Sequence, residues 1–223
     1  MNQQIPHQIV NTNSLRLTLK FNREGILVIR KPSVMPFEKV EAFVIQHIDW
    51  IKKHYENAKV EERRFETGEN YLYLGKNYKL VIIENKYESV FVQENKIYVF
   101  VPNGKNAKTI ISKWKKAECE KTFAILLLEC FKKMEYCLER YPNLEIKNYK
   151  ARWGTCYPKK NKISLNSSLI HVDIDLIEYV IFHELSHFVH LNHSKYFHDF
   201  LKKFVPDESK KKARLRKFKC YYE

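Results

Sequence analysis

The sequence is short of the residues that make linkers, disulfide frameworks and membrane spans. It has 5 glycines and 7 prolines in 223 residues, so no low-complexity linker stands out. Its 5 cysteines are odd in number and form no CxxC pair, which argues against a disulfide framework and favours a reducing compartment. Residues 1–10 lack the features of a signal peptide, and the apolar run 123–128 is too short to cross a bilayer. We therefore expect a cytoplasmic protein with no membrane partner.

Charge, by contrast, is abundant and mostly positive. Lys and Arg total 40 against 26 acidic residues, which gives a formal net charge of +14, and many of these cations gather in residues 210–219. Such a charge favours contact with polyanions by long-range attraction, but a solvated basic surface has the same composition. Hydrophobic residues make up 44% of the chain, which is enough for a packed core. The composition leaves nucleic acid as a candidate partner of a folded protein.

Hydrophobic periodicity predicts a chain of mixed α and β structure. Apolar runs that are short or alternate predict strands, and apolar residues at helical spacing predict helices. The predicted strands are 15–21, 26–29, 71–74, 78–83, 89–93, 97–101, 144–149 and 162–166. The predicted helices are 37–58, 105–140, one that Asp173 or Asp175 caps and Asn192 closes, 194–204, and an amphipathic one in the basic tail. We divide the chain into a β-rich N-terminal part, 1–104, and a catalytic part, 105–223.

The segment His183-Glu184-Leu185-Ser186-His187 is an HExxH motif inside an apolar helical pattern. Residues four apart lie on one face of a helix, so both imidazoles can reach one metal ion. Glu184 lies about 100° round the helix from His183, where it can address a metal-bound water without occupying the metal. Zinc lowers the pKa of such a water, and a carboxylate takes its proton. The motif predicts a zinc-dependent hydrolase; the alternative is two core histidines satisfied by hydrogen bonds.

A catalytic zinc has three protein ligands and one open position, so a third ligand must follow the motif. The candidates are His190, His193 and His198. His190 would lie about 7 Å along the axis from the metal if the helix continued at about 1.5 Å per residue. His193 can reach the metal only if the helix breaks first, and Asn192 tolerates the left-handed conformation of such a break. We predict His193 as the third ligand and keep His198 as the fallback.

Several segments together resemble the YgjP-type predicted metal-dependent hydrolases, which are relatives of the WLM and SprT-like minimal metalloproteases. These segments are 152–156 (Arg-Trp-Gly-Thr-Cys), 163–166, the HExxH motif, Asn192-His193-Ser194, Phe197 and Pro206. Their order and gaps match over residues 146–218. The chain departs from that family at Thr155, where Ser is usual, and at His198, near a position where Trp is frequent.

The resemblance implies an α+β fold with a β-rich N-terminal part and a zincin-like catalytic core, in which the HExxH helix packs against a small sheet. It implies a zinc metallopeptidase that acts on protein or peptide substrates, with Zn²⁺ held by His183, His187 and His193. The WLM and SprT relatives cleave proteins bound to DNA, which keeps nucleic acid among the candidate partners. The pattern is not that of a metzincin, because His190 stands where metzincins have Gly and no Met follows Met134.

Other side chains are candidates for contact with the substrate or the transition state. Arg152, Tyr149, Tyr196 and His198 can each donate a hydrogen bond to an oxyanion. The segment 152–156 can instead brace the active-site helix, and a fourth ligand from it would close the position that a substrate needs. The strand predicted at 162–166 is a candidate cleft edge for a peptide that docks by strand addition.

Two other functions stay open at this point. The first is a nucleic-acid-associated binding protein whose metal is structural or vestigial, and the second is a hydrolase of non-peptide substrates. Glu184 and the absence of an apparent fourth ligand argue against a structural metal site.

Overall fold

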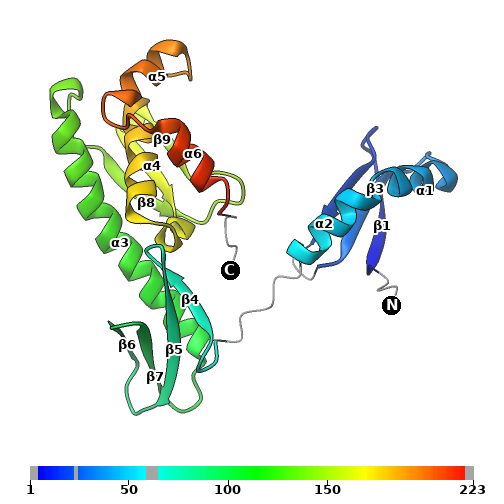
Figure 1. Cartoon of the computed structure of the whole chain (residues 1–223), viewed down its shortest axis with the longest axis horizontal. Helices are drawn as coiled ribbons and strands as arrows, with labels where there is room; N and C mark the ends of the chain where they lie inside the picture. Colours follow the sequence, from blue (N-terminus) through cyan, green and yellow to red (C-terminus); the bar gives the residue numbers. More distant parts are fainter. Residues whose placement is uncertain (1–4, 23–24, 59–64, 219–223) are drawn as a thin grey trace. The chain divides into compact units, whose positions relative to one another are not determined.

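The computed structural model describes residues 5–22, 25–58 and 65–218 (Figure 1). Lys219, the last residue of the predicted basic tail, lies outside them. The chain divides into two compact units, Met1–Arg64 and Phe65–Glu223. Both units contain strands and helices, as predicted for a mixed α and β chain. The boundary drawn at residue 104 falls inside the second unit, between a strand and a long helix.

The first unit is a three-stranded sheet with two helices. Its elements are β1 His7–Thr12, β2 Thr18–Phe21, β3 Leu27–Pro32, α1 Phe37–Gln46 and α2 Ile48–Ala58. Strand β3 is central, parallel to β1 and antiparallel to β2. Its Leu27 and Ile29 form a small core with Val40 and Ile51 of the two helices. The unit therefore has a hydrophobic core of its own.

One sequence prediction for this unit is wrong, and one strand was missed. The single helix predicted over 37–58 is two helices, because the backbone at His47 leaves helical values (φ −106°, ψ 15°). The His47 ring also bonds the Phe43 carbonyl at 2.8 Å, which supports the end of α1. Strand β1 was not predicted, because most of its side chains are exposed and carry no hydrophobic pattern.

The second unit begins with a four-stranded sheet, whose strands were all predicted. They are β4 Asn70–Tyr73, β5 Lys76–Glu84, β6 Ser89–Gln93 and β7 Lys96–Val101, in the order β4-β5-β7-β6. Leu74 and Gly75 join β4 to β5 with φ of 47° and 77°, as a two-residue hairpin turn requires. Strands β5 and β7 are parallel, and the outer pairs are antiparallel.

A smaller sheet lies nearer the HExxH helix. Its strands are β8 Asn143–Lys147, β9 Gly154–Tyr157 and β10 Lys162–Asn166, in the order β8-β10-β9. Strand β10 is therefore central, and its prediction as the cleft edge is wrong. The two edge strands are β8 and β9. Strand β9 has no alternating hydrophobic pattern and was not predicted.

Helices connect and cover the two sheets of the second unit. They are α3 Ala107–Met134, α4 Ile174–Ser186, α5 Lys195–Lys202 and α6 Glu208–Leu215, with short 3-10 turns η1 Glu135–Cys137, η2 Pro158–Lys160 and η3 Ser167–His171. The long helix α3 contacts β6 and β7 at one end and β8, η3 and α4 further along (Figure 1). Helix α4 contacts β9, β10, α5 and α6 as well. One hydrophobic core joins all these elements.

Helix α4 ends earlier than predicted. Its last residue is Ser186, not Asn192, because the N–H groups of Phe188 and Val189 bond carbonyls three residues back and tighten the chain into turns. None of the helices in the described ranges has the length and apolar character of a membrane span.

Candidate metal centre

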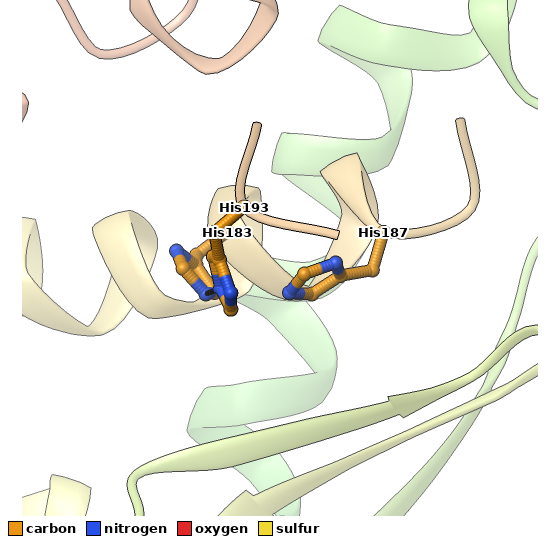
Figure 2. A group of neighbouring side chains, drawn as sticks. All are labelled: His183, His187 and His193. Atoms are coloured by element: carbon orange, nitrogen blue, oxygen red, sulfur yellow. Dashed lines mark hydrogen bonds between the residues drawn. The ribbon is translucent and has the colours of Figure 1, made fainter. Parts of the chain in front are cut away.

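Helix α4 holds the first two histidines of the motif at its C-terminal end. The helix buries Leu176, Ile177, Val180 and Ile181, and so its position in the second unit is fixed by packing. His183 and His187 lie one turn apart, with their ring centroids 5.0 Å from each other. Figure 2 shows the two rings on the same side of the helix.

His193 joins them from the segment that follows α4. Its Nε2 lies 2.9 Å from Nε2 of His183, and one ligand atom from each of the three histidines lies within 4.8 Å of the others. Figure 2 shows the three rings grouped at one place. The early end of α4 makes this possible, since the chain turns back between His187 and His193.

His190 contributes its backbone and not its ring. Nδ1 of His187 lies 3.1 Å from the His190 carbonyl oxygen, to which it donates a hydrogen bond. That bond places the proton of a neutral His187 on Nδ1, so Nε2 is the atom left for a metal. The His190 ring contacts Phe200 instead, with 5.3 Å between centroids.

A single buried ring packs against all three imidazoles. The Phe197 centroid lies 4.9 Å from that of His183, 4.6 Å from that of His187 and 4.9 Å from that of His193. Burial, followed by the neighbouring His187 and His193, lowers the pKa of His183 to about 3. Burial also lowers the pKa values of His187 and His193. The three rings are therefore neutral at pH 7, which is the form that binds a metal.

Glu184 follows His183 on α4 and is buried, with 6% of its surface exposed. Burial raises its pKa to about 8, against the opposing effects of a hydrogen bond from the Cys156 N–H and the charge of Arg152. Gly154 also touches it closely: a Cβ at that position would lie 2.7 Å from Oε1 of Glu184. Strand β9 therefore supports the carboxylate with its backbone. The contact agrees with the expectation that segment 152–156 braces the active-site helix, but the partner atoms on Glu184 were not predicted.

The other predicted site residues lie in different places. Arg152 is exposed, donates to Thr155 Oγ1 over 3.4 Å and acts on Glu184 through its charge. Tyr196 is 74% exposed on α5. His198, the fallback ligand, is outside the group of ligand atoms, and its ring centroid lies 6.3 Å from that of His193.

Two further residues complete the surroundings of the site. Glu208 of α6, which sequence reasoning missed, accepts a hydrogen bond from His198 Nδ1 at 2.8 Å. Cys156 does not join the ligand group, and burial, followed by the charge of Glu184, raises the pKa of its thiol to about 12. It is therefore a neutral thiol at pH 7 rather than a thiolate ligand.

The donor set suits a divalent transition metal. Three neutral imidazole nitrogens converge, and no fourth ligand joins them among the residues that the structure describes. Imidazole ligands favour zinc and its neighbours over magnesium or calcium, and three of them leave one position for water or substrate. The residues present therefore fit a metal of the catalytic kind.

The match to a protein family agrees with this chemistry. Residues 15–218 match the family described as "YgjP-like, metallopeptidase domain". No curated protein matches the chain significantly. The metallopeptidase zymogens abylysin of Pyrococcus abyssi and jannalysin of Methanocaldococcus jannaschii are among the similar solved structures, at 21% and 22% identity and TM-scores of 0.38 and 0.39. The alignments cover 42% and 43% of this chain and 90% and 94% of those proteins.

The family match spans most of the chain and includes the motif, the third histidine and both sheets of the second unit. The chain belongs to the YgjP-like metallopeptidase family and is a metal-dependent peptidase.

Proposed function

We propose that the protein is a zincin-like, zinc-dependent peptidase in which His183, His187 and His193 hold the metal and Glu184 is the general base. The observation that carries the proposal is the convergence of three imidazole nitrogens within 4.8 Å of one another, with the buried carboxylate of Glu184 directly after His183 in the sequence. Zn²⁺, when bound, supplies a Lewis acid that polarises the scissile carbonyl and acidifies the attacking water.

Glu184 moves the proton in this scheme. Its carboxylate takes a proton from the attacking water and delivers it to the nitrogen of the leaving amine. Burial raises the pKa of Glu184 and favours the neutral acid, whereas the Cys156 N–H and the Arg152 charge favour the ionised form that can accept a proton. A divalent cation held by the three histidines would also favour the ionised form. Gly154 keeps the carboxylate in place by its close approach.

The free edge of β9 is the best candidate surface for the peptide. The Trp153 carbonyl accepts from the Asn166 N–H at 2.8 Å, so the backbone groups of Gly154 and Cys156 point away from β10. The Cys156 N–H reaches Glu184 on that side. A substrate that adds to this edge as a strand would pass directly beside the general base. Arg152, Tyr196 and His198 remain candidates for contact with it.

A role in nucleic-acid binding has no support from the family match. Some cations of the basic tail are already paired within the fold. Arg214 donates to Asp175 at 2.7 Å and to Asp173 at 2.9 Å, and Lys211 lies 3.6 Å from Asp175. These pairs attach α6 to the start of α4. A cytoplasmic location also remains a proposal, consistent with the free thiols of the four described cysteines.

The test is the variant Glu184→Gln. We expect it to keep wild-type zinc content, because Glu184 is not a ligand, and to lose casein or peptide hydrolysis by about 10²–10⁴-fold. Zinc is measured by elemental analysis of the purified protein, and cleavage by release of a fluorescent peptide fragment. The matched control is Glu178→Gln, a carboxylate on α4 outside the ligand group. Undiminished turnover in Glu184→Gln would remove the assigned role.

A further inference from the structure

His198 stands next to the metal centre without being part of the ligand set. Helix α5 begins just after His193, and its Phe197 packs against all three candidate ligands. The His198 ring lies 5.3 Å from the Phe197 ring and 6.3 Å from the His193 ring, measured between centroids. Its side chain is 31% exposed, so part of the ring is accessible to a bound molecule.

The ring is held from behind by a buried carboxylate. Glu208, the first residue of α6, has 5% of its side chain exposed, and its Oε1 lies 2.8 Å from Nδ1 of His198. A carboxylate in this position accepts the hydrogen bond, so the shared proton resides on Nδ1 of the imidazole. Among the described residues, His198 is the one side chain that donates to Glu208. Nε2 of His198 makes no hydrogen bond to a described residue, which leaves it available to a bound molecule.

This carboxylate is not needed to attach α6 to the rest of the unit. Arg214, two turns further along α6, is bonded to Asp175 at 2.7 Å and to Asp173 at 2.9 Å, and Leu215 is buried in the core. Desolvation of a buried carboxylate offsets much of the free energy that its hydrogen bond contributes to stability. Stability alone therefore does not account for Glu208, whereas a role in setting the tautomer of His198 does.

We propose that Glu208 is a positioning residue: it fixes His198 with the proton on Nδ1, so that Nε2 is presented to the substrate beside the metal. This inference rests on the proposed peptidase function, in which the substrate occupies the space next to His193. His198 touches the substrate, and Glu208 acts through it. The arrangement assigns a role to a buried acid that lies within an otherwise basic segment, 208–217.

The first experiment reads the tautomer and does not depend on activity. Protein labelled with ¹⁵N at histidine and loaded with zinc is studied by long-range ¹H–¹⁵N NMR, with His198→Gln identifying the resonance. We expect Nδ1–H for His198 in the wild type and in Glu208→Gln, whose amide oxygen still accepts the bond. We expect loss of that preference in Glu208→Ala. A wild-type ring protonated only on Nε2 would overturn the proposal.

The second experiment measures turnover of a peptide by the zinc-loaded variants. We expect kcat of Glu208→Ala to fall by about 10–100-fold, the range for a lost supporting group, and Glu208→Gln to recover much of it. Arg214→Gln is the matched control: it loosens α6 and lowers the Tm, but it should leave the His198 tautomer and kcat unchanged. An unchanged kcat in Glu208→Ala would refute the positioning role.

The two experiments also separate this inference from the peptidase proposal. If the zinc-loaded wild type cleaves no peptide, the proposed zinc-dependent mechanism fails, while the NMR spectra still decide whether Glu208 fixes the ring. If the wild type cleaves peptides and the Glu208 variants follow Arg214→Gln in every measurement, Glu208 is only structural and the inference is wrong.

Discussion

The contact between Gly154 and Glu184 gives the sharpest prediction. In Gly154→Ala the new methyl group would lie 2.7 Å from Oε1, 2.8 Å from Cγ and 2.9 Å from Cδ of Glu184, and ordinary contact begins at 3.4 Å. The overlap is thus about 0.7 Å at its worst. All three atoms belong to the Glu184 side chain, so the fold can yield by moving the carboxylate rather than the backbone.

The consequence should fall on catalysis more than on stability. Overpacking of this size costs about 1–3 kcal/mol of unfolding free energy. A displacement approaching 1 Å in a catalytic group can cost about 10²-fold in rate, so we expect kcat to fall by about 10–100-fold. Zinc content should not change, because none of the three histidines is among the atoms nearest the new methyl.

The assay is peptide turnover per bound zinc, compared with thermal unfolding of the same samples. Gly68→Ala is the matched control: its φ of 92° makes alanine strained there, yet no atom lies within 4 Å of the new methyl. It should lower the Tm while leaving kcat per zinc unchanged. A zinc-loaded Gly154→Ala with wild-type kcat would show that the backbone of β9 does not hold the general base.

Three more predictions concern the ligands and the stability of the second unit. Loss of a group that supports a ligand weakens metal binding by about 10–100-fold, so His193→Ala, which removes a ligand, should weaken zinc binding by more than this. His190→Ala keeps the backbone carbonyl that accepts from His187 and should bind zinc normally in a competition titration. Burial raises the pKa of Asp175, but the hydrogen bond and charge of Arg214 outweigh burial, and the net effect is a lowered pKa. The stabilisation from this pair is therefore present above the unfolded-state pKa and is lost as the pH falls through the folded-state pKa. Arg214→Gln should flatten the fall of Tm in acid, and an unaltered Tm profile would contradict this. Gly75→Ala should cost at least about 1–3 kcal/mol in urea unfolding, because the methyl would overlap the N-cap residue of α4 at a positive φ.

The sequence predicted those features that depend on local geometry. The spacing of His183 and His187 follows from the helical repeat, and the need for a break before His193 follows from the rise per residue. The structure brings these three rings together, and their role as ligands stays a prediction. The four strands of the larger sheet were confirmed, because each carries its own hydrophobic pattern.

What the sequence did not reveal depends on long-range pairing. Strand β9 is short and has half-buried side chains throughout, so its pattern does not identify it as a strand. The central place of β10 follows from its pairing with both β8 and β9, which no local pattern encodes. The contact between Glu208 and His198 likewise could not be predicted, because it depends on how the fold brings α6 next to α5.

The long helix α3 links the stability of the larger sheet to that of the HExxH helix. It lines the larger sheet over part of its length and the HExxH helix over another part, and the side chains of all three belong to one core. If α3 moved away from either the larger sheet or the HExxH helix, apolar surface in both regions would be exposed to water. The stability of the metal centre therefore depends in part on four strands that supply no ligand. Destabilising substitutions in these strands should also lower activity, although the strands do not contact the three histidines.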